Sequence, residues 1–375
     1  MSATDLLRDR LREHPLPGEA DAAARSWPVV EAALARHSPA VRRRRTSVRL
    51  ALVLALLCVA LVAALSPAGA WIGDRFHHES PSAKPAFADL PRGGSVLAIS
   101  GSGAYAIRPD GSSRRLGAFA EAGWSPHGLH VVGAEGRRLV AVDAAGTVKW
   151  MLTSRRPVGH PAWSTGLGYA VAYLEGRSLK VVSGNGDPTT NRVLRRDAAP
   201  VTPAWRPHSD RVLTFATGAG ALATVDVQTG RTLWTAPDAP ARALEWAPGG
   251  RRLVALRSRS VTVLDRNGHV VREVALPGFA RAMALHPSGE RVALVVGRRV
   301  LGLRLAGGEP RQLFQGGVDG IAWSQDGRRL LLGWRDADQW LLLGPGGRIK
   351  ALHGVSGELG AAGGFPRVAA WCCAR

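Results

Sequence analysis

From residue 95 onward, short apolar runs alternate with polar turns, and the same order of runs recurs along the chain. One unit contains an apolar run at 252–256, a second at 261–265, an Asn267-Gly268 pair and a more polar run at 270–274. β-Branched residues are frequent in these runs, and an Asn-Gly pair between two such runs is typical of a tight hairpin. A further short run opens each unit. The pattern therefore predicts four antiparallel strands per unit rather than a helical repeat.

Each opening run ends in an aromatic residue or Leu, which we call the repeat anchor. A turn phrase such as Trp323-Ser324-Gln325-Asp326-Gly327 follows the anchor, and Pro, Asp and Gly in these phrases favour a chain reversal. The anchors fall 38 to 42 residues apart, a period that suits one four-stranded propeller blade. They are Trp124, Trp163, Trp205, Trp246, Leu285 and Trp323.

The two ends of the repeat region complement each other. Before Trp124 there are three strand-like runs, 95–100, 103–108 and 113–119, and no opening run. After the last unit one run remains, 367–373, which contains a further anchor, Trp371. If this run supplies the missing strand, the region forms seven blades with no open edge between the first and the last. We therefore expect an all-β, seven-bladed β-propeller over 95–375, closed by its C-terminal strand.

The phrase at 323–330 resembles the repeats of TolB-type and WD-repeat-like bacterial propellers. Two units also carry Asp-to-Trp phrases, at 143–150 and 226–234, which are similar to quinoprotein-like propeller repeats. No Trp-Asp dipeptide occurs, so the chain departs from the strict WD signature. This resemblance implies a propeller fold and does not imply an activity, because one fold serves many functions.

Residues 50–73 form a second distinctive segment, because they contain no charged side chain. About twenty apolar residues in a helix are enough to cross a bilayer core of about 30 Å. Arg42, Arg43, Arg44, Arg45 and Arg49 precede the segment, and positive charge beside a span tends to stay in the cytoplasm. We therefore expect one transmembrane helix at 50–73 with the N-terminus inside and the propeller outside the cytoplasmic membrane.

The same segment has a competing interpretation as a secretory signal. Ala68-Gly69-Ala70 resembles a cleavage site, so a mature protein could begin near Trp71. The 49 preceding residues and the length of the apolar stretch favour an uncleaved anchor. Residues 74–94, rich in Pro, Ser and charged residues, are expected to be a flexible linker.

The net charge of +20 divides between the two sides of this segment. Residues 1–49 carry +4 and the remainder carries +16. A basic domain inside a cell would suggest nucleic acid, but outside the membrane anionic envelope polymers or lipid headgroups fit better. Arg-rich, Lys-poor usage is also consistent with genome base composition alone. We expect protein partners, contact with the membrane through one helix, and no nucleic acid.

Candidate chemistry is sparse. The chain contains no nucleophile-elbow, phosphate-loop or zinc-protease motif, so we expect no enzyme, no cofactor and no metal site. His127, His208 and His286 occupy similar places in the anchor turns and are interpreted as turn residues. Cys372 and Cys373 are adjacent, so in a strand their side chains should point to opposite faces as small buried residues. A vicinal disulfide is the alternative in an oxidising compartment.

The N-terminal tail, 1–49, leaves two functional hypotheses open. It contains two short amphipathic patterns, around Leu6 to Leu11 and around Trp27 to Leu34, which could dock on a partner. The first hypothesis is a non-enzymatic, membrane-anchored propeller outside the cytoplasm that binds or scaffolds partners. The second is a transmembrane regulator that resembles membrane-bound anti-sigma proteins, in which the tail would hold a transcription factor. In either case we expect the tail to be short and helical or disordered. A propeller enzyme would need acids or His gathered at one place.

Overall fold

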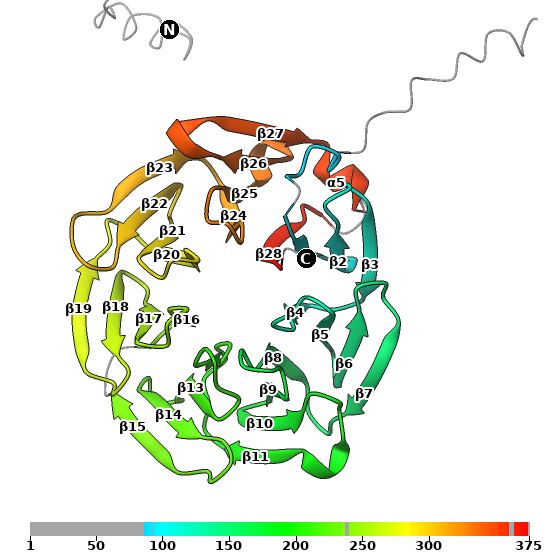
Figure 1. The fold of residues 1–375 in the computed structure, drawn as a ribbon, viewed down its shortest axis with the longest axis vertical. Coiled ribbons are helices and arrows are strands. Elements are labelled where there is room, and N and C mark those ends of the chain that lie inside the picture. Colours follow the sequence, from blue (N-terminus) through cyan, green and yellow to red (C-terminus); the bar gives the residue numbers. More distant parts are fainter. Residues whose placement is uncertain (1–85, 92, 237–239, 360–363, 374–375) are drawn as a thin grey trace, which may run out of the picture. The chain divides into compact units, whose positions relative to one another are not determined.

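The computed structural model describes residues 86–91, 93–236, 240–359 and 364–373. Within these ranges the chain forms seven four-stranded antiparallel sheets, which stand around a central axis as the blades of a ring (Figure 1). The expected seven-bladed β-propeller is confirmed. The predicted tail, 1–49, and the predicted span, 50–73, lie outside the described residues. In the described part of the chain, no helix has the length and apolar character needed to cross a bilayer.

Six blades follow one another along the chain, and we number them 1 to 6. Blade 1 contains β4 (Glu121–Trp124), β5 (His130–Glu135), β6 (Arg138–Asp143) and β7 (Val148–Thr153). Blade 2 contains β8 (Val158–Trp163), β9 (Ala170–Glu175), β10 (Ser178–Ser183) and β11 (Arg192–Arg195). Blade 3 contains β12 (Ala204–Trp205), β13 (Val212–Ala216), β14 (Leu222–Asp226) and β15 (Thr232–Ala236).

The remaining internal blades have the same order. Blade 4 contains β16 (Ala243–Trp246), β17 (Arg252–Leu256), β18 (Ser260–Asp265) and β19 (Val270–Ala275). Blade 5 contains β20 (Ala280–Leu285), β21 (Arg291–Val296), β22 (Arg299–Arg304) and β23 (Arg311–Gln315). Blade 6 contains β24 (Val318–Trp323), β25 (Leu330–Trp334), β26 (Gln339–Leu343) and β27 (Ile349–His353). Short helical turns lie in the connections: η1 (Pro188–Thr190), η2 (Arg335–Ala337), η3 (Pro345–Gly347) and α5 (Val355–Glu358).

The seventh blade joins the two ends of the propeller, and we call it the composite blade. Its strands are β28 (Arg367–Cys372), β1 (Ser95–Ser100), β2 (Gly103–Ile107) and β3 (Ser113–Gly117), with β28 innermost. β28 pairs antiparallel with β1 from Ser95 opposite Cys372 to Ile99 opposite Arg367. The predicted closure by the C-terminal strand is therefore confirmed.

The hydrophobic core lies between neighbouring blades. The two middle strands of a blade are buried on both faces, as in β17 and β18, whereas the outermost strand β19 is mostly exposed and buries Val274. One cluster joins Val132 and Leu139 of blade 1 to Val171 and Tyr173 of blade 2. Burying one such large side chain stabilises the fold by about 1.5–3 kcal/mol. The blades therefore stabilise one another, and no blade has a core of its own.

The repeat anchors lie at the inner ends of the blades, where several of them bond to the preceding blade. The indole Nε1 of Trp205 donates to the carbonyl oxygen of Ala162 at 3.0 Å, and that of Trp323 donates to Ala284 at 3.1 Å. Trp246 Nε1 donates to Thr214 Oγ1 at 3.1 Å. Six of the seven anchors are the last residue of an innermost strand, and the seventh, Trp371, lies within β28. The six are Trp124, Trp163, Trp205, Trp246, Leu285 and Trp323.

Two further tryptophans link blades at the outside of the ring, within the phrases that resemble quinoprotein repeats. Trp150 of β7 donates from Nε1 to Gly184 of blade 2 at 2.8 Å, and a Cβ added at Gly186 would lie 2.4 Å from its ring. Trp234 of β15 repeats the arrangement on blade 4, where it donates to Arg266 at 3.0 Å and a Cβ at Gly268 would lie 2.5 Å from its ring. In both places an indole packs on a turn glycine of the next blade.

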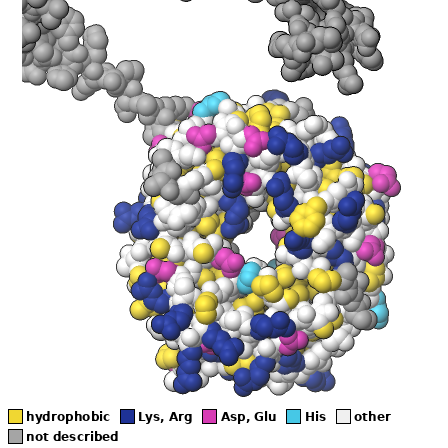
Figure 2. Space-filling model, turned by 180° about the vertical axis from the view of Figure 1, so that it is seen from behind, with side chains coloured by type: hydrophobic (Ala, Val, Ile, Leu, Met, Phe, Trp, Pro, Cys, Tyr) yellow, Lys and Arg dark blue, Asp and Glu magenta, His cyan; other side chains and the backbone are white. Residues whose placement is uncertain are grey.

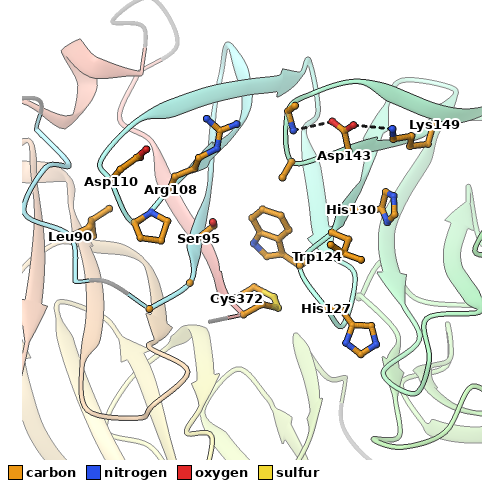
Figure 3. Close-up of a pocket in the computed structure, with 18 of the residues that line it drawn as sticks. Leu90, Ser95, Arg108, Asp110, Trp124, His127, His130, Asp143, Lys149 and Cys372 are labelled. Carbon is orange, nitrogen blue, oxygen red and sulfur yellow. Dashed lines mark hydrogen bonds and ion pairs between the residues drawn. A yellow bond between two sulfur atoms is a disulfide. The ribbon is translucent and has the colours of Figure 1, made fainter. Parts of the chain in front are cut away.

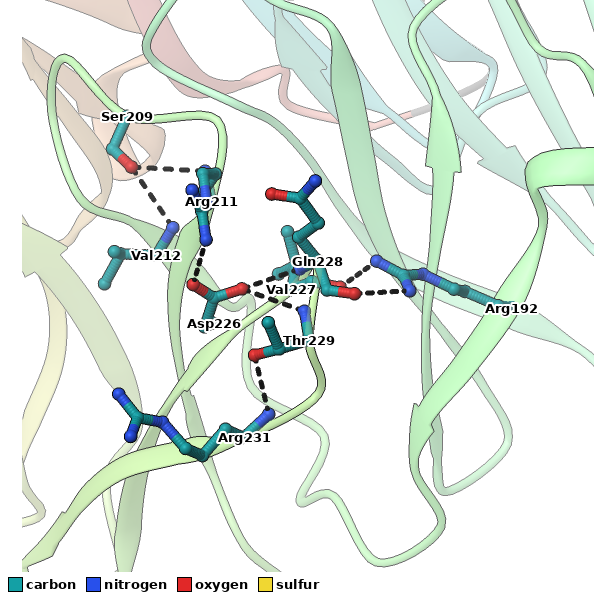
Figure 4. Close-up of polar contacts among 9 residues, drawn as sticks. All are labelled: Arg192, Ser209, Arg211, Val212, Asp226, Val227, Gln228, Thr229 and Arg231. Carbon is teal, nitrogen blue, oxygen red and sulfur yellow. Dashed lines mark hydrogen bonds and ion pairs between the residues drawn. The ribbon is translucent and has the colours of Figure 1, made fainter.

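The turn that precedes Trp234 is held by one carboxylate. Asp226 accepts hydrogen bonds from the backbone N–H groups of Gln228 at 2.9 Å and Thr229 at 3.0 Å, and it pairs with Arg211 at 2.7 Å (Figure 4). Arg192 of blade 2 donates to the carbonyl oxygens of Val227 and Gln228 in the same turn. Asp226 therefore stabilises this turn from within, and Arg192 of the preceding blade binds the same turn from outside.

The residues just before β1 pack into the propeller. Phe87 and Leu90 are buried, and the ring centroid of Phe87 lies 5.0 Å from that of Trp340 in blade 6. The backbone N–H of Leu90 donates to Phe87 at 2.9 Å, which closes a tight turn. The sequence places both residues in the linker 74–94, but in the structure they belong to the core of the composite blade and blade 6.

The packing of Trp234 on Gly268 predicts a difference between two glycine substitutions. Gly268 and Gly230 both have positive φ, 88° and 72°, so Ala at either site should cost about 1–2 kcal/mol of backbone strain. A Cβ at Gly230 meets nothing within 4 Å, whereas a Cβ at Gly268 collides with the indole. Gly268→Ala should therefore lower the free energy of unfolding by about 1–3 kcal/mol more than Gly230→Ala. Urea denaturation of both variants measures this difference, and equal losses would show that the indole yields without cost.

Candidate functional site

Cys372 and Cys373 form a disulfide at the end of β28. The expectation that they point to opposite faces as separate buried side chains is wrong. The strand ends at Cys372, and Cys373 has a φ of 57°, so the alternation of a strand does not continue to the second cysteine. Both residues are half-buried.

The disulfide packs against the first anchor turn of blade 1. Cys373 Sγ lies 3.4 Å from the carbonyl oxygen of Pro126, and Cys372 Sγ lies 3.9 Å from that of Ser125. A Cβ added at Gly128 would lie 2.8 Å from Cys373 Cβ, so this close approach requires glycine there. The disulfide therefore contacts blade 1 at the seam between the composite blade and blade 1.

An open groove of about 1420 Å³ lies at this seam (Figure 3). Its walls come from the segment before β1, the turn after β2, the anchor turn of blade 1 and the turn between β6 and β7. The lining residues are Ala88, Leu90, Gly93, Gly94, Ser95, Arg108, Pro109, Asp110, Trp124, His127, Gly128, Leu129, His130, Asp143, Ala144, Ala145, Lys149, Cys372 and Cys373. Trp124 is the only repeat anchor among them.

The two acids of the groove are engaged by their own turns. Asp143 accepts from Lys149 Nζ and from the backbone N–H groups of Ala145 and Thr147, each at 2.9 Å. The bond from Lys149, followed by that from Thr147, lowers the pKa of Asp143 to about 2. Asp110 accepts from the hydroxyl and the N–H of Ser112, at 2.6 and 2.8 Å, and these bonds lower its pKa.

Three further polar side chains of the groove, Arg108, His127 and His130, make no hydrogen bond or ion pair with another described residue. The charge of Arg108 nevertheless acts on the carboxylate of Asp110, and the ring centroid of His130 lies 6.3 Å from that of Trp163 in blade 2. Arg108 is half-buried, and in the close-up it stands between the composite blade and blade 1 (Figure 3). The groove thus offers an apolar floor, made by Trp124 and the disulfide, with donors at its sides.

A second polar group joins the innermost strands of blades 1 and 2. Glu121 of β4 accepts a hydrogen bond from the backbone N–H of His160 in β8, and His160 Nδ1 lies 3.5 Å from the same carboxylate and 3.4 Å from Thr202 Oγ1. His160 has a φ of 55°, which is unusual for a non-glycine residue. Figure 2 shows a face of the ring on which Lys and Arg side chains are spread around the open channel, with acidic, His and hydrophobic side chains also at its edge. In the described ranges, no three or more His, Cys, Asp or Glu side chains are placed to hold a metal ion.

Glu245 makes a similar link on the other side of the ring. It lies half-buried on β16, and its carboxylate accepts from the backbone N–H of Leu285 in the next blade at 3.1 Å. Burial raises the pKa of Glu245 to about 7, and the bond from Leu285 offsets only part of this rise. One hydrogen bond is too little to compensate a carboxylate withdrawn from water.

The three turn histidines have different surroundings. His286 is buried: its Nδ1 accepts from Ser288 N–H at 3.0 Å, and its Nε2 lies 3.0 Å from the carbonyl oxygen of Gly327 in blade 6. Burial lowers the pKa of His286. His127 lies on the groove, and His208 sits in its turn with a φ of 60°. Sequence inspection missed Arg108 and His130, because nothing in the repeat distinguishes them before the ring closes.

Comparison with known proteins supports the fold. No family model matches the sequence, and no curated protein matches it significantly. The β-propeller domain of Cps50 (Swd1) from Myceliophteria thermophila superimposes with a TM-score of 0.52 at 15% identity, over 62% of this chain and 85% of that one. At this identity the likeness shows a shared β-propeller fold alone. Hydrazine synthase of Kuenenia stuttgartiensis aligns at 19% identity over 60% of this chain and 75% of that one, with a TM-score of 0.46, which is too low for any argument.

The raised pKa of Glu245 predicts a pH-dependent stability. The folded state holds the proton more tightly than the unfolded state, so stability should fall as the pH rises from about 4.5 to about 7 and then level off. Glu245→Gln keeps an acceptor for Leu285 and removes the ionisation. It should raise the free energy of unfolding on the order of 2 kcal/mol at about pH 8. Below about pH 4, where the carboxyl is protonated in both states, the variant and the parent should match. An unchanged difference across this range would contradict the assignment.

Proposed function

We propose that this chain is a membrane-anchored propeller outside the cytoplasm that binds or scaffolds a partner and catalyses no reaction. The seam groove is the main support for this proposal, because it combines an apolar floor with three polar side chains, Arg108, His127 and His130, that make no hydrogen bond or ion pair with another described residue. Such a combination favours binding. Its two acids accept bonds from their own turns, and these bonds lower the pKa of both carboxyls, so the two carboxylates are weak bases.

Two features support the proposed location. Residues 50–73 are uncharged and follow an arginine cluster, which favours one span with the N-terminus inside. A disulfide between Cys372 and Cys373 is suited to an oxidising compartment outside the cytoplasm. The phrase at 323–330 is the reason to place the propeller near the TolB-type and WD-repeat-like groups. A surface as basic as this one could also contact anionic envelope polymers or lipid headgroups.

The second candidate function is a transmembrane regulator. The two amphipathic patterns of the tail, 1–49, favour it, because short helices with apolar stripes bind in grooves of partner proteins. In this arrangement the propeller would sense a ligand, and the tail would hold a transcription factor.

The location predicts the behaviour of reporter fusions. Alkaline phosphatase, which folds only outside the cytoplasm, should be active when fused after Arg375, and green fluorescent protein fused there should stay dark. Fusions after residue 40, before the span, should behave in the opposite way. A fluorescent C-terminal fusion would contradict the topology. The intact mass of the membrane-bound protein should include residues 1–70, whereas a mature form that begins near Trp71 would show cleavage.

The choice between the two functions predicts which crosslinked partners depend on the tail. In-cell crosslinking of the full chain and of a version without residues 1–40 should give the same partners if the propeller carries the function. Mass spectrometry of the crosslinked products identifies them. Loss of a transcription factor together with the tail would favour the regulator instead.

A further inference from the structure

The loop that connects blade 4 to blade 5 carries an exposed aromatic side chain. Residues 276–279 join β19 to β20, and Phe279 is 46% exposed. Neighbouring turns hold the backbone of this loop from both sides: the N–H of Leu276 donates to Arg259 at 2.8 Å, and the N–H of Gly297 donates to Phe279 at 2.9 Å. The β17–β18 turn and the β21–β22 turn therefore lie against the loop.

Three exposed arginines lie around this loop. The guanidinium carbon of Arg242 lies over the ring of Phe279, 4.2 Å from its centroid. Arg281 donates to the carbonyl oxygen of Gly297 at 2.7 Å, which holds its guanidinium beside the turn that contacts Phe279. Arg259 belongs to the other turn that holds the loop. We call Arg242, Arg259, Phe279 and Arg281 the arginine patch.

The arginines of the patch keep most of their donors available. In the ranges that the structure describes, none of the three forms an ion pair, and the bond from Arg281 to Gly297 is the one hydrogen bond that their side chains make. A guanidinium group has five N–H donors and stays charged at any physiological pH. The patch therefore presents three permanent positive charges to solvent.

Acids near the patch do not balance these charges. Glu273 of β19 is exposed, and its carboxylate accepts from a serine hydroxyl of β18 at 2.9 Å. Asp336 pairs with Arg298 at 2.8 Å, so these two charges cancel each other. Burial raises the pKa of Glu245 to about 7, so at neutral pH this group carries only part of a negative charge. The connection 237–239, which contains one acid, lies outside the described residues. The described part of the patch and its surroundings therefore has an excess of positive charge.

This composition favours a linear polyanion over other anionic partners. Arginine binds phosphate and carboxylate oxygens through two N–H groups at once, and guanidinium groups held at separate turns offer such contacts at several points along an anionic chain. A lipid surface or a folded acidic protein would also require exposed apolar area. The aromatic ring of the loop does not supply it freely, because Arg242 covers one face of Phe279.

We infer that the arginine patch binds a linear polyanion, a polymer that repeats phosphate or carboxylate groups. This inference rests on the proposed location outside the cytoplasm, which favours envelope polymers over nucleic acid, and it gives the proposed contact with such polymers a place on the molecule. Arg242, Arg259 and Arg281 would pair with successive anionic groups of the polymer. Phe279 would position Arg242 through its ring.

Two fluorescent polymers test this inference on the full-length protein in nanodiscs of zwitterionic lipid. The probes are inorganic polyphosphate and polygalacturonate, and fluorescence anisotropy measures their binding. We expect saturable binding of at least one polymer, weakened by salt, and the preferred polymer identifies phosphate or carboxylate as the recognised group. Absence of saturable binding of both polymers would overturn the inference. Stronger competition by phosphatidylglycerol vesicles or by duplex DNA than by unlabelled polymer would also overturn it.

Two triple variants with the same net charge locate the site. Substitution of Arg242, Arg259 and Arg281 by Gln should weaken binding of the preferred polymer about tenfold or more and reduce its salt dependence. The control variant replaces three exposed arginines of blades 1, 3 and 6, which also form no ion pair with a described residue, by Gln. These control positions are Arg137, Arg231 and Arg348.

The control separates a site from the general charge of the protein. It should lose about threefold or less in affinity, because it lowers the net charge but leaves the patch intact. Equal losses in the two triple variants would show that net charge alone attracts the polymer and would contradict the inference. If the patch variant fails to fold, the single substitution Arg259→Gln keeps the test, because this side chain makes no bond to a described residue. It should weaken binding about threefold, and Arg137→Gln should not.

Failure of this inference can be separated from failure of the proposed function. If the C-terminal reporter fusions place the propeller outside while the two triple variants bind polymer alike, only the arginine patch is wrong. If the C-terminal fluorescent fusion is bright and the patch prefers DNA to both polymers, the location and the ligand class are both wrong.

Discussion

Strand β28 forms antiparallel pairs with β1, and the rest of the structure depends on this one pairing. It supplies the innermost strand of the composite blade, and it removes the open edge that β1 would otherwise present. Because the core lies between blades, an open ring would also expose the apolar faces of the composite blade and its two neighbours. Closure is therefore a condition for burying the core around the whole ring, and the seam groove exists only because of it.

Between the other blades, specific bonds add to apolar packing. Indole N–H groups near the axis and at the periphery donate to the neighbouring blade, as Trp205 does to Ala162 and Trp150 does to Gly184. Each such bond contributes only about 1 kcal/mol. These bonds are directional: an indole N–H that donates to one fixed acceptor restricts how far the two blades can rotate against each other. The apolar clusters hold the blades together, and the tryptophans set their spacing.

The repeat architecture could be predicted from sequence because it is periodic. Anchors such as Trp124 and Trp323 recur at nearly constant spacing, and the unmatched run at 367–373 was enough to predict the closure. The groove could not be predicted, because its residues come from five stretches of the chain that only the closed ring brings together. Arg108 looks like any other turn arginine until β28 and the anchor turn of blade 1 lie beside it. From the sequence the disulfide is only the alternative to two separate buried cysteines, because strand alternation favours opposite faces; the positive φ of Cys373 ends that alternation.

The pairing of β28 with β1 also determines when the propeller can finish folding. A ribosome makes β1 nearly a whole propeller's length of chain before it makes β28, so the composite blade stays incomplete while blades 1 to 6 are synthesised. Contacts between such distant segments form slowly, because the loop that they close is long. During this interval β1 presents a free edge of main-chain N–H and C=O groups. The free edge of β1 therefore needs protection from pairing with other chains until β28 has been synthesised. Export of an unfolded chain, followed by folding outside, would make β1 and β28 available at the same time.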